Sequence, residues 1–222
     1  EFAPKQTGIT RYAWKSVAYE PGNQVAVVAS TLADATIAAQ VAKGSVVVVV
    51  GRANLAEDDS FTMAALDAVM AAAPNATVLP VIRRGNVRGA IETGLVTGST
   101  TSILRSAAAG KINCLILLGA DPIADVRDTE LARQAMAAVQ HVVAIDTFAS
   151  SSSQRADVLL PAAAFGEKDG TTTNLEGRMS NVAQKITPAG TSRPDWMIAA
   201  ELAAALGKDL GVGSVEEVTA KL

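Results

Sequence analysis

Short apolar runs recur along the chain and alternate with longer segments of helical periodicity. Residues 46–50 are five consecutive valines, an unalternating pattern that is typical of a parallel strand covered by helices on both faces. The other runs have strand length and stop at turn-forming residues, so each of them predicts a strand. The four or five predicted strands cover residues 25–29, 46–50, 77–82, 112–118 and 142–145, and a shorter apolar run at 158–160 stops at Pro161.

Between these runs, apolar residues recur every three or four positions, which predicts amphipathic helices. Asp58, Asp59 or Ser60 can cap one of these helices, and Pro74 follows its end. Ser214 begins the capping-box sequence Ser-Val-Glu-Glu, which predicts a last helix. The predicted helices cover residues 31–43, about 60–72, 102–109 and 129–140, one that starts at Pro194 and ends at Gly207, and the one after Ser214.

The alternation of strands and helices predicts an α/β fold with a doubly wound, mainly parallel sheet and helices on both of its faces. Residues 83–101 interrupt this rhythm with four glycines and the cluster Arg83, Arg84 and Arg88. We expect a surface excursion with a helical turn there. From Gly166 onward, the sequence predicts an irregular loop or short hairpin, followed by the closing helices.

The chain has no initiator methionine, no internal repeat and no low-complexity linker. We therefore expect a piece of a longer protein, with a leading segment over residues 1–20 and one domain over residues 21–222. The opening Glu1-Phe2 fits a remnant of cloning.

Composition limits the function classes. A formal charge of −3 and a pI of about 5.2 argue against a nucleic-acid partner. Mean hydropathy is +0.26, yet no apolar run approaches the roughly 18 residues of a membrane helix. With one cysteine and one histidine, the chain by itself cannot form a disulfide, a multi-cysteine zinc site or a cysteine-ligated iron–sulfur cluster. Forty-three alanines and only eight aromatic residues predict a core built by close approach of small and aliphatic side chains.

The predicted topology places two candidate ligand positions at one edge of the sheet. In a doubly wound sheet, ligands lie outside the carboxyl ends of the strands. The fourth predicted strand ends in Gly119-Ala-Asp121-Pro122 and the fifth in Asp146-Thr147. Asp121 can accept from an amine or hydroxyl, but the four residues alone favour an ordinary strand-to-helix turn with Asp121 as a local backbone acceptor. Asp146 is equally able to bind a ribose or base edge and to cap a turn.

The remaining polar candidates favour structural roles. Residues 51–54 lack the three-glycine spacing of a dinucleotide fingerprint, and neither a Walker A motif nor a nucleophile elbow occurs. Cys114 lies within a strand, where we expect a buried and inert thiol. His141 lies at the amino end of its strand, away from the ligand edge, and we expect a surface or capping residue. The three arginines of residues 83–88 can bind an anion, but we favour a solvated loop.

The densest polar segment follows the last predicted strand, and its motifs resemble a known superfamily. They read Ala-Asp-Val-Leu-Leu-Pro-Ala at residues 156–162, Glu-Lys-Asp-Gly-Thr at 167–171, Thr-Asn-Leu-Glu-Gly-Arg at 173–178 and Arg-Pro-Asp-Trp at 193–196. With Leu-Gly-Ala-Asp-Pro at 118–122, the segment 112–207 resembles the molybdopterin-dinucleotide oxidoreductases, and Gly-Asn-Val-Arg-Gly at 85–89 matches more weakly. Its Glu-Gly-Arg ending is more similar to the large iron–sulfur subunit of NADH:quinone oxidoreductase (respiratory complex I) than to formate dehydrogenases.

The complex I resemblance implies a structural, non-catalytic domain that supports electron transfer from NADH to quinone. It also implies iron–sulfur clusters in an N-terminal region, contacts with that region and with neighbouring subunits, and a peripheral arm on the cytoplasmic side of the membrane. It implies no cofactor, catalytic residue or metal ligand on this segment. The residues of a remnant pterin-dinucleotide crevice would be Gly119, Asp121, Asp146, Asn174, Glu176 and Arg178.

Two alternatives stay open. The first is the cofactor-binding domain of a molybdenum-dependent oxidoreductase such as a formate dehydrogenase. There Asp121, Asp146 and Asn174 would bind molybdopterin guanine dinucleotide. The second is a free nucleotide-binding module like the central domain of thiamine-dependent enzymes, which shares the alternating pattern but lacks the Glu-Gly-Arg region.

Overall fold

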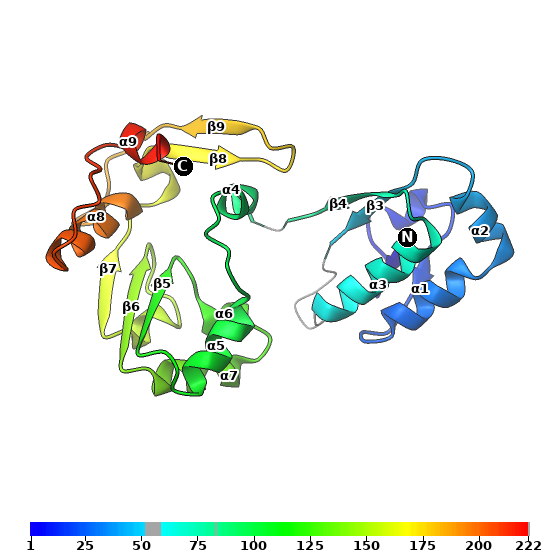
Figure 1. Ribbon diagram of the computed structural model, residues 1–222, viewed down its shortest axis with the longest axis horizontal. Coiled ribbons are helices and arrows are strands. Elements are labelled where there is room, and N and C mark those ends of the chain that lie inside the picture. Colours follow the sequence, from blue (N-terminus) through cyan, green and yellow to red (C-terminus); the bar gives the residue numbers. More distant parts are fainter. Residues whose placement is uncertain (52–58, 83, 222) are drawn as a thin grey trace. The chain divides into compact units, whose positions relative to one another are not determined.

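The computed structural model describes residues 1–51, 59–82 and 84–221 and divides the chain into two compact units, Glu1–Arg83 and Arg84–Leu222 (Figure 1). The predictions for Arg52 to Asn54, for Arg83 and for a helix cap at Asp58 lie outside the described residues. The boundary expected after residue 20 remains a prediction. The first unit contains β1 (Phe2–Ala3), the 3-10 helix η1 (Thr10–Tyr12), β2 (Val17–Ala18), α1 (Gln24–Leu32), α2 (Ala35–Val41), β3 (Val47–Val50), α3 (Asp59–Ala72) and β4 (Thr77–Pro80).

In the first unit, the strand predicted over residues 25–29 is wrong, because this run lies inside helix α1. A short apolar run has no periodicity that distinguishes a strand from a buried helix. Packing decides the conformation here: α1 lies against α3, and its Val28 is buried. At the start of the helix, the Gln24 side chain accepts a hydrogen bond from the Gly22 N–H at 2.8 Å.

The single helix predicted over residues 31–43 is divided in two. The carboxylate of Asp34 accepts hydrogen bonds from the N–H groups of Thr36 and Ile37 at 2.9 and 3.2 Å, which makes it the N-cap of α2. Asp34 has extended backbone angles, which end the helical conformation of α1 nearby. The aspartate within this segment was the signal for the break.

Strand β3 pairs in parallel with β4, with Val47 opposite Thr77. The prediction that helices cover β3 on both faces is wrong within this unit, since Val47 and Val49 are 60% and 63% exposed. Val48 and Val50 point to the half-buried face. A run of valines therefore specified a strand without specifying what covers each side of it.

The second unit contains a three-stranded parallel sheet, a hairpin and most of the helices. Its elements are α4 (Val87–Glu92), α5 (Thr100–Ala108), β5 (Cys114–Leu118), α6 (Pro122–Asp125), α7 (Thr129–Ala138), β6 (His141–Asp146), η2 (Ser153–Arg155), β7 (Val158–Pro161), η3 (Phe165–Glu167), β8 (Gly170–Thr173), β9 (Met179–Val182), α8 (Asp195–Ala205) and α9 (Val215–Thr219).

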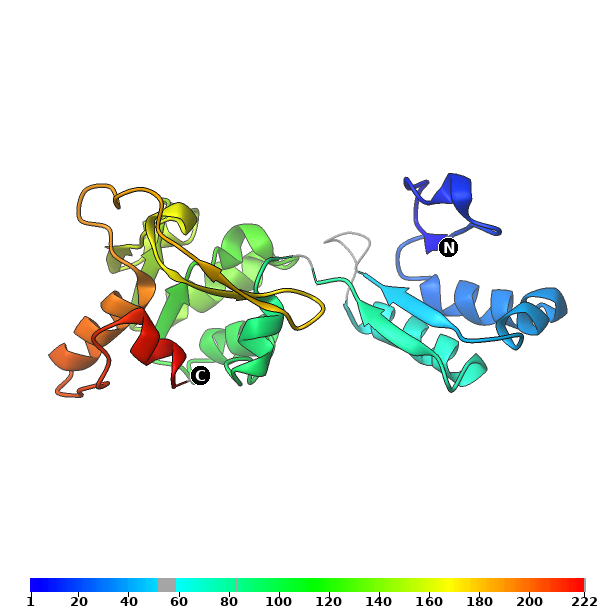
Figure 2. The same ribbon diagram turned by 90° about the horizontal axis from the view of Figure 1, so that it is seen from above.

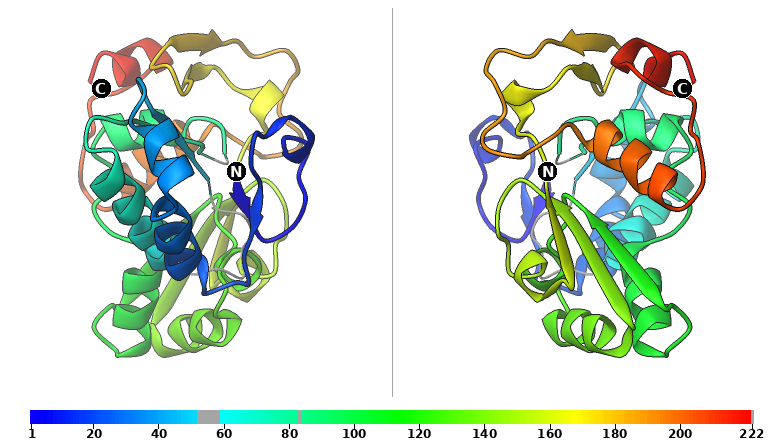
Figure 3. Two further views of the ribbon diagram at one scale, coloured as in Figure 1. Left: turned by 90° about the vertical axis from the view of Figure 1, so that its right-hand side faces the viewer. Right: turned by 90° about the vertical axis from the view of Figure 1, so that its left-hand side faces the viewer.

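The order of the parallel sheet is β5-β6-β7, with Leu115 opposite Val142 and Ala144 opposite Leu159 (Figure 3). On one face, Leu115 and Val142 join the main core, which α5 and α7 complete. On the other face, Ile145 packs with Ile198 of α8. A mixed α/β fold with a parallel sheet and helices on both faces is therefore present in this unit.

Alanine has the role that composition predicted. Ala107, Ala132, Ala135 and Ala144 belong to the main core and have no exposed surface. Such small side chains allow α5 and α7 to approach each other and the sheet closely.

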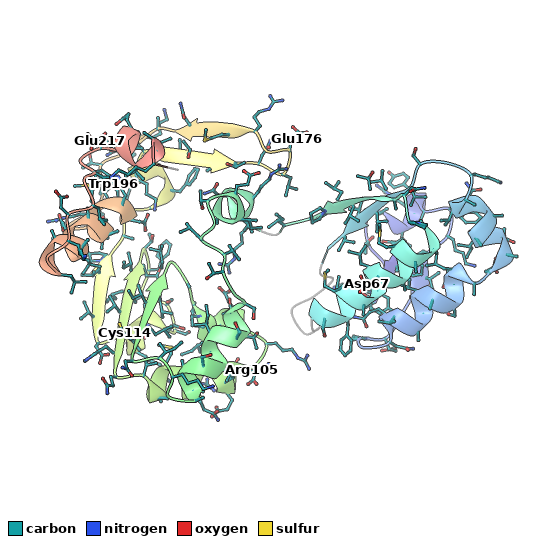
Figure 4. The ribbon with its side chains drawn as sticks, viewed as in Figure 1. Asp67, Arg105, Cys114, Glu176, Trp196 and Glu217 are labelled. Carbon is teal, nitrogen blue, oxygen red and sulfur yellow. The ribbon has the colours of Figure 1, made fainter. Side chains whose placement is uncertain are left out.

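The prediction of a buried thiol at Cys114 is wrong, because this thiol is exposed. It begins strand β5 (Figure 4), on the face opposite Leu115 and Leu117. Ile116 and Leu118 share this face and are also exposed. The pattern 112–118 predicted a strand correctly, but α8 covers this face only beside β6 and β7.

We expect the Cys114 thiol to react in the native chain with Ellman's reagent. Because it is exposed and is the sole cysteine, native and denatured protein should release the same single equivalent of thionitrobenzoate, with no lag in the native sample. A native reaction that proceeds only at the rate of unfolding would contradict the exposed position.

Within the described ranges, no single helix is both long and apolar enough to cross a membrane; α1 and α2 meet that criterion only as a pair bent by 84°.

Candidate functional site

The carboxyl ends of β5 and β6 place Gly119, Asp121 and Asp146 at one edge of the parallel sheet, as the topology predicted. This edge faces the side of the unit on which β8 and β9 lie (Figures 1 and 3). The Gly119 N–H donates to the Ile145 carbonyl at 2.8 Å, which extends the β5–β6 pairing by one residue. No atom lies within 4 Å of the position that a Cβ of Gly119 would occupy, so a ligand can approach this backbone closely.

Asp121 binds a distant loop and caps a helix at the same time. It is the N-cap of α6, where its carboxylate accepts from the Ala124 N–H at 3.3 Å. The same carboxylate accepts from the N–H groups of Ser151 and Ser152, each at 3.1 Å, and from the Ser152 hydroxyl at 2.5 Å. Four donors thus converge on one side chain, which joins the loop after β6 to the end of β5.

These contacts control the charge of Asp121. Partial burial raises the pKa of its carboxyl group, but the hydrogen bonds from Ser152, Ala124 and Ser151 lower it by more, and the net pKa lies below the ordinary aspartate value. Asp121 is therefore a carboxylate at neutral pH. With its oxygens occupied by the loop, it supports the ligand edge rather than offering free acceptors to a ligand.

Asp146 is held by the same loop but keeps acceptor capacity. One oxygen accepts from the Ser150 hydroxyl at 2.9 Å, and the other accepts a long hydrogen bond of 3.4 Å from the Phe148 N–H. A carboxylate can accept about four hydrogen bonds. Asp146 is partly exposed, and the neighbouring Phe148 ring is 78% exposed. Asp146 can therefore still accept hydrogen bonds from a ligand.

The serines of residues 150–153 are the functional residues that the sequence analysis missed. Ser152 and Ser153 are almost fully buried. The Ser152 hydroxyl donates to Asp121 and accepts from the Ile123 N–H at 3.0 Å, and Ser150 and Ser153 hydrogen-bond to each other. Four consecutive serines after a strand that ends in aspartate were an available signal, because short hydroxyl side chains are donors suited to a carboxylate.

Asn174, Glu176 and Arg178 lie on a different element, the turn 174–178 between β8 and β9. The Asn174 side chain accepts from the N–H groups of Glu176 and Arg178 at 3.0 and 2.9 Å. For the described residues, no hydrogen bond or ion pair joins this turn to Asp121 or Asp146. The structure therefore brings the six predicted residues together as two groups of three.

Most other charged residues of the motif region have partners within the fold. Lys168 pairs with Asp195 at the start of α8. The Glu167 carboxylate accepts from the Ala164 N–H at 2.8 Å, and Asp169 accepts from the Gln184 N–H at 2.9 Å.

Local structure also accounts for Arg84 of the arginine cluster, for Asp157 and for the single histidine. Arg84 pairs with Asp125 at 2.6 Å. Asp157 accepts from the Val142 N–H at 2.7 Å and so links the beginnings of β6 and β7. His141 is exposed at the amino end of β6, as predicted. Among the residues with described positions, no group of three or more His, Cys, Asp or Glu side chains could hold a metal ion.

Curated relatives match about half of this chain. The chain is 28% identical over 151 residues to the NADPH-Fe(3+) oxidoreductase subunit alpha of Geobacter sulfurreducens, a match that covers 56% of this chain and 18% of that protein. It is 36% identical over 96 residues to the F420-dependent formate dehydrogenase subunit alpha of Methanocaldococcus jannaschii (43% and 14%). It is 37% identical over 99 residues to the assimilatory nitrate reductase catalytic subunit of Bacillus subtilis (45% and 14%). The chain thus spans less than a fifth of the length of these relatives.

These similarities overturn the prediction of a structural complex I subunit, because the relatives are subunits of formate dehydrogenase, nitrate reductase and a related oxidoreductase. The Glu-Gly-Arg ending on which that prediction depended has a local explanation. Gly177 has a φ of +83° in a tight turn, so the backbone conformation favours glycine there. The family model for molybdopterin oxidoreductases matches residues 2–205. The chain therefore belongs to the molybdopterin oxidoreductase family.

Proposed function

We propose that this chain is a cofactor-binding segment of a molybdenum-dependent oxidoreductase of the formate dehydrogenase or nitrate reductase type. It holds the nucleotide end of molybdopterin guanine dinucleotide at the carboxyl ends of β5 and β6, within one doubly wound sheet. The observation that carries the proposal is the partly exposed Asp146 carboxylate at this edge, in a chain of the molybdopterin oxidoreductase family.

The donor set fits a guanine nucleotide. The free acceptor capacity of Asp146 suits the N–H donors of guanine or the hydroxyls of a ribose. The backbone of Gly119 has no side chain that would block a ligand's approach, and the exposed Phe148 ring offers a stacking surface. Asp121 and Ser152 fix the loop that positions these groups.

The exposed Arg178 suits the diphosphate that joins the nucleotide to the pterin, because a guanidinium binds phosphate oxygens in pairs. When bound, the cofactor supplies the molybdenum centre for electron exchange with the substrate. The residues of this chain bind and orient its nucleotide end, and we assign none of them a catalytic role.

Contacts with further subunits and with a cluster-bearing segment of the same polypeptide remain predictions. The peripheral-arm location depended on the complex I resemblance, which the relatives contradict.

Calorimetric titration of the 222-residue chain with GDP and with ADP tests the proposal. We expect GDP to bind more tightly than ADP, because adenine presents no paired N–H donors to a carboxylate. Asp146→Asn should weaken GDP binding about tenfold and remove the preference, since a hydrogen bond to a charged group contributes about 1.5–3 kcal/mol.

Glu216→Gln on α9 is the matched control, because it removes one exposed carboxylate and should leave both affinities unchanged. Absence of GDP binding, or equal affinity for GDP and ADP in the native sequence, would contradict the proposal.

A further inference from the structure

Two motifs that lie far apart in the sequence interlock in the second unit. One is the segment 86–89 at the start of α4, and the other is the turn 174–178 with the end of β8. Asn86 accepts a hydrogen bond from the Thr173 N–H at 2.9 Å across 87 residues of sequence. Arg88 donates through Nη1 to the Leu175 carbonyl. Figures 1 and 2 show α4 beside this end of the hairpin.

Arg88 lies directly against Gly177. A Cβ on Gly177 would lie 2.7 Å from Nη2 and 3.0 Å from Cζ of Arg88, so a side chain at this position would displace the guanidinium. The guanidinium packs on the bare backbone of the turn while it donates to Leu175. Glycine at position 177 therefore allows this contact, in addition to the φ of +83° that the turn requires.

The start of α4 has a backbone conformation that favours this docking. Asn86 has a φ of +61°, the sole positive φ of a non-glycine residue in the described ranges. Asparagine adopts this left-handed conformation more readily than most other residues with a Cβ. This conformation directs the Asn86 amide to Thr173, and a Cβ on Gly89 would clash with that amide.

The donors of Arg88 are committed within the protein. Its Nε donates to Glu92 at 2.7 Å on the next turn of α4, and Nη1 donates to Leu175. By contrast, neither Glu176 nor Arg178 has a side-chain partner among the described residues, and both are exposed. Figure 4 shows Glu176 at the end of the hairpin. Arg88 thus holds the turn, whereas Glu176 and Arg178 remain available to a ligand.

We propose that Arg88 is a positioning residue that fixes the turn 174–178 so that Arg178 can bind the diphosphate of the nucleotide cofactor. This inference rests on the proposed function. It gives the segment 85–89 a role in holding the turn 174–178, although this segment is not among the residues proposed to contact the cofactor. It also separates the residue that orders the turn from the residue that contacts the ligand.

The test compares Arg88→Gln with Arg105→Gln, which removes an exposed arginine from α5. The first readout is amide hydrogen exchange of residues 174–178 without ligand. We expect Arg88→Gln to accelerate it about tenfold, the effect of losing one hydrogen bond of about 1.4 kcal/mol. Arg105→Gln should leave it unchanged, and Arg88→Lys should restore part of the protection.

The second readout is the affinity for GDP compared with guanosine, measured by calorimetry. Arg88→Gln should weaken GDP binding about tenfold and leave guanosine binding unchanged, because only the diphosphate contacts Arg178. An equal loss for both ligands would indicate a general structural effect and overturn the positioning role.

The two proposals fail in different ways. If the native sequence binds no GDP, the proposed function fails and the diphosphate role fails with it, while hydrogen exchange still decides whether Arg88 orders the turn. If the native sequence binds GDP but Arg88→Gln changes neither exchange nor GDP affinity, the role of Arg88 alone is overturned.

Discussion

Replacing Asp121 with alanine is expected to destabilise the second unit by about 3 kcal/mol, because four donors lose their acceptor together and two of them belong to the buried Ser152. The hydroxyl of Ser152, which is fully buried, and the N–H groups of Ser151, Ser152 and Ala124 all donate to this carboxylate. Urea unfolding followed by Trp196 fluorescence measures the loss. A Trp14→Phe background removes the other tryptophan, which lies in the first unit.

Asp128→Ala is the matched control for this substitution. Asp128 caps the neighbouring helix α7 but accepts a single hydrogen bond, from the Leu131 N–H at 2.9 Å, so we expect a loss of about 1 kcal/mol. Equal destabilisation by the two substitutions would show that the serine loop contributes nothing beyond an ordinary helix cap.

The effect of Asp121→Ala should also depend on pH. Because the folded-state pKa of Asp121 lies below its unfolded value of about 3.9, its stabilisation is complete above that pH and is lost as the pH falls through the folded pKa. The difference between the parent chain and Asp121→Ala should therefore be constant near pH 7 and shrink below about pH 4. A difference that does not change down to about pH 2 would contradict a folded-state pKa of Asp121 below its unfolded value.

Leu104→Ala should destabilise the same unit by about 3 kcal/mol, because it leaves a cavity in a core that small residues already fill closely. Leu104 is 2% exposed and packs in the cluster that contains Ala107, Ala132 and Leu115. The Trp196 signal in the Trp14→Phe background again reports the unfolding of this unit.

Ile103→Ala is the control for Leu104→Ala, since it removes a similar side chain from the adjacent position of α5. Ile103 is 43% exposed, so we expect a loss below about 1 kcal/mol. If the two substitutions had the same effect, the assignment of the buried face of α5 would be wrong.

The sequence predicted the second unit better than the first, and the reason is physical. In residues 100–161, periodicity, helix caps and strand length agree, and α5, β5, α7, β6 and β7 lie close to their predicted positions. Residues 25–29 lack such agreement. Their short apolar run suits a strand or a helix, and the contact between α1 and α3 decided between them.

The candidate site was predictable only in part. The positions of Asp121 and Asp146 at one sheet edge follow from the parallel topology alone. Their different roles do not, because they depend on which donors the serine loop brings to each carboxylate. The likeness to complex I depended on Glu-Gly-Arg, whose glycine is explained by the positive φ of the turn, and this glycine also allows the contact with Arg88.

The α/β class and the parallel strands of the second unit follow from the sequence, since periodicity and capping act between residues that are near in the chain. The family followed from the resemblance of the motifs at residues 118–122 and 156–196. The exposure of Cys114, the bond from Ser152 to Asp121 and the packing of Arg88 on Gly177 depend on tertiary contacts. Periodicity specifies which side chains share a face, but the elements that cover the face come from distant parts of the chain.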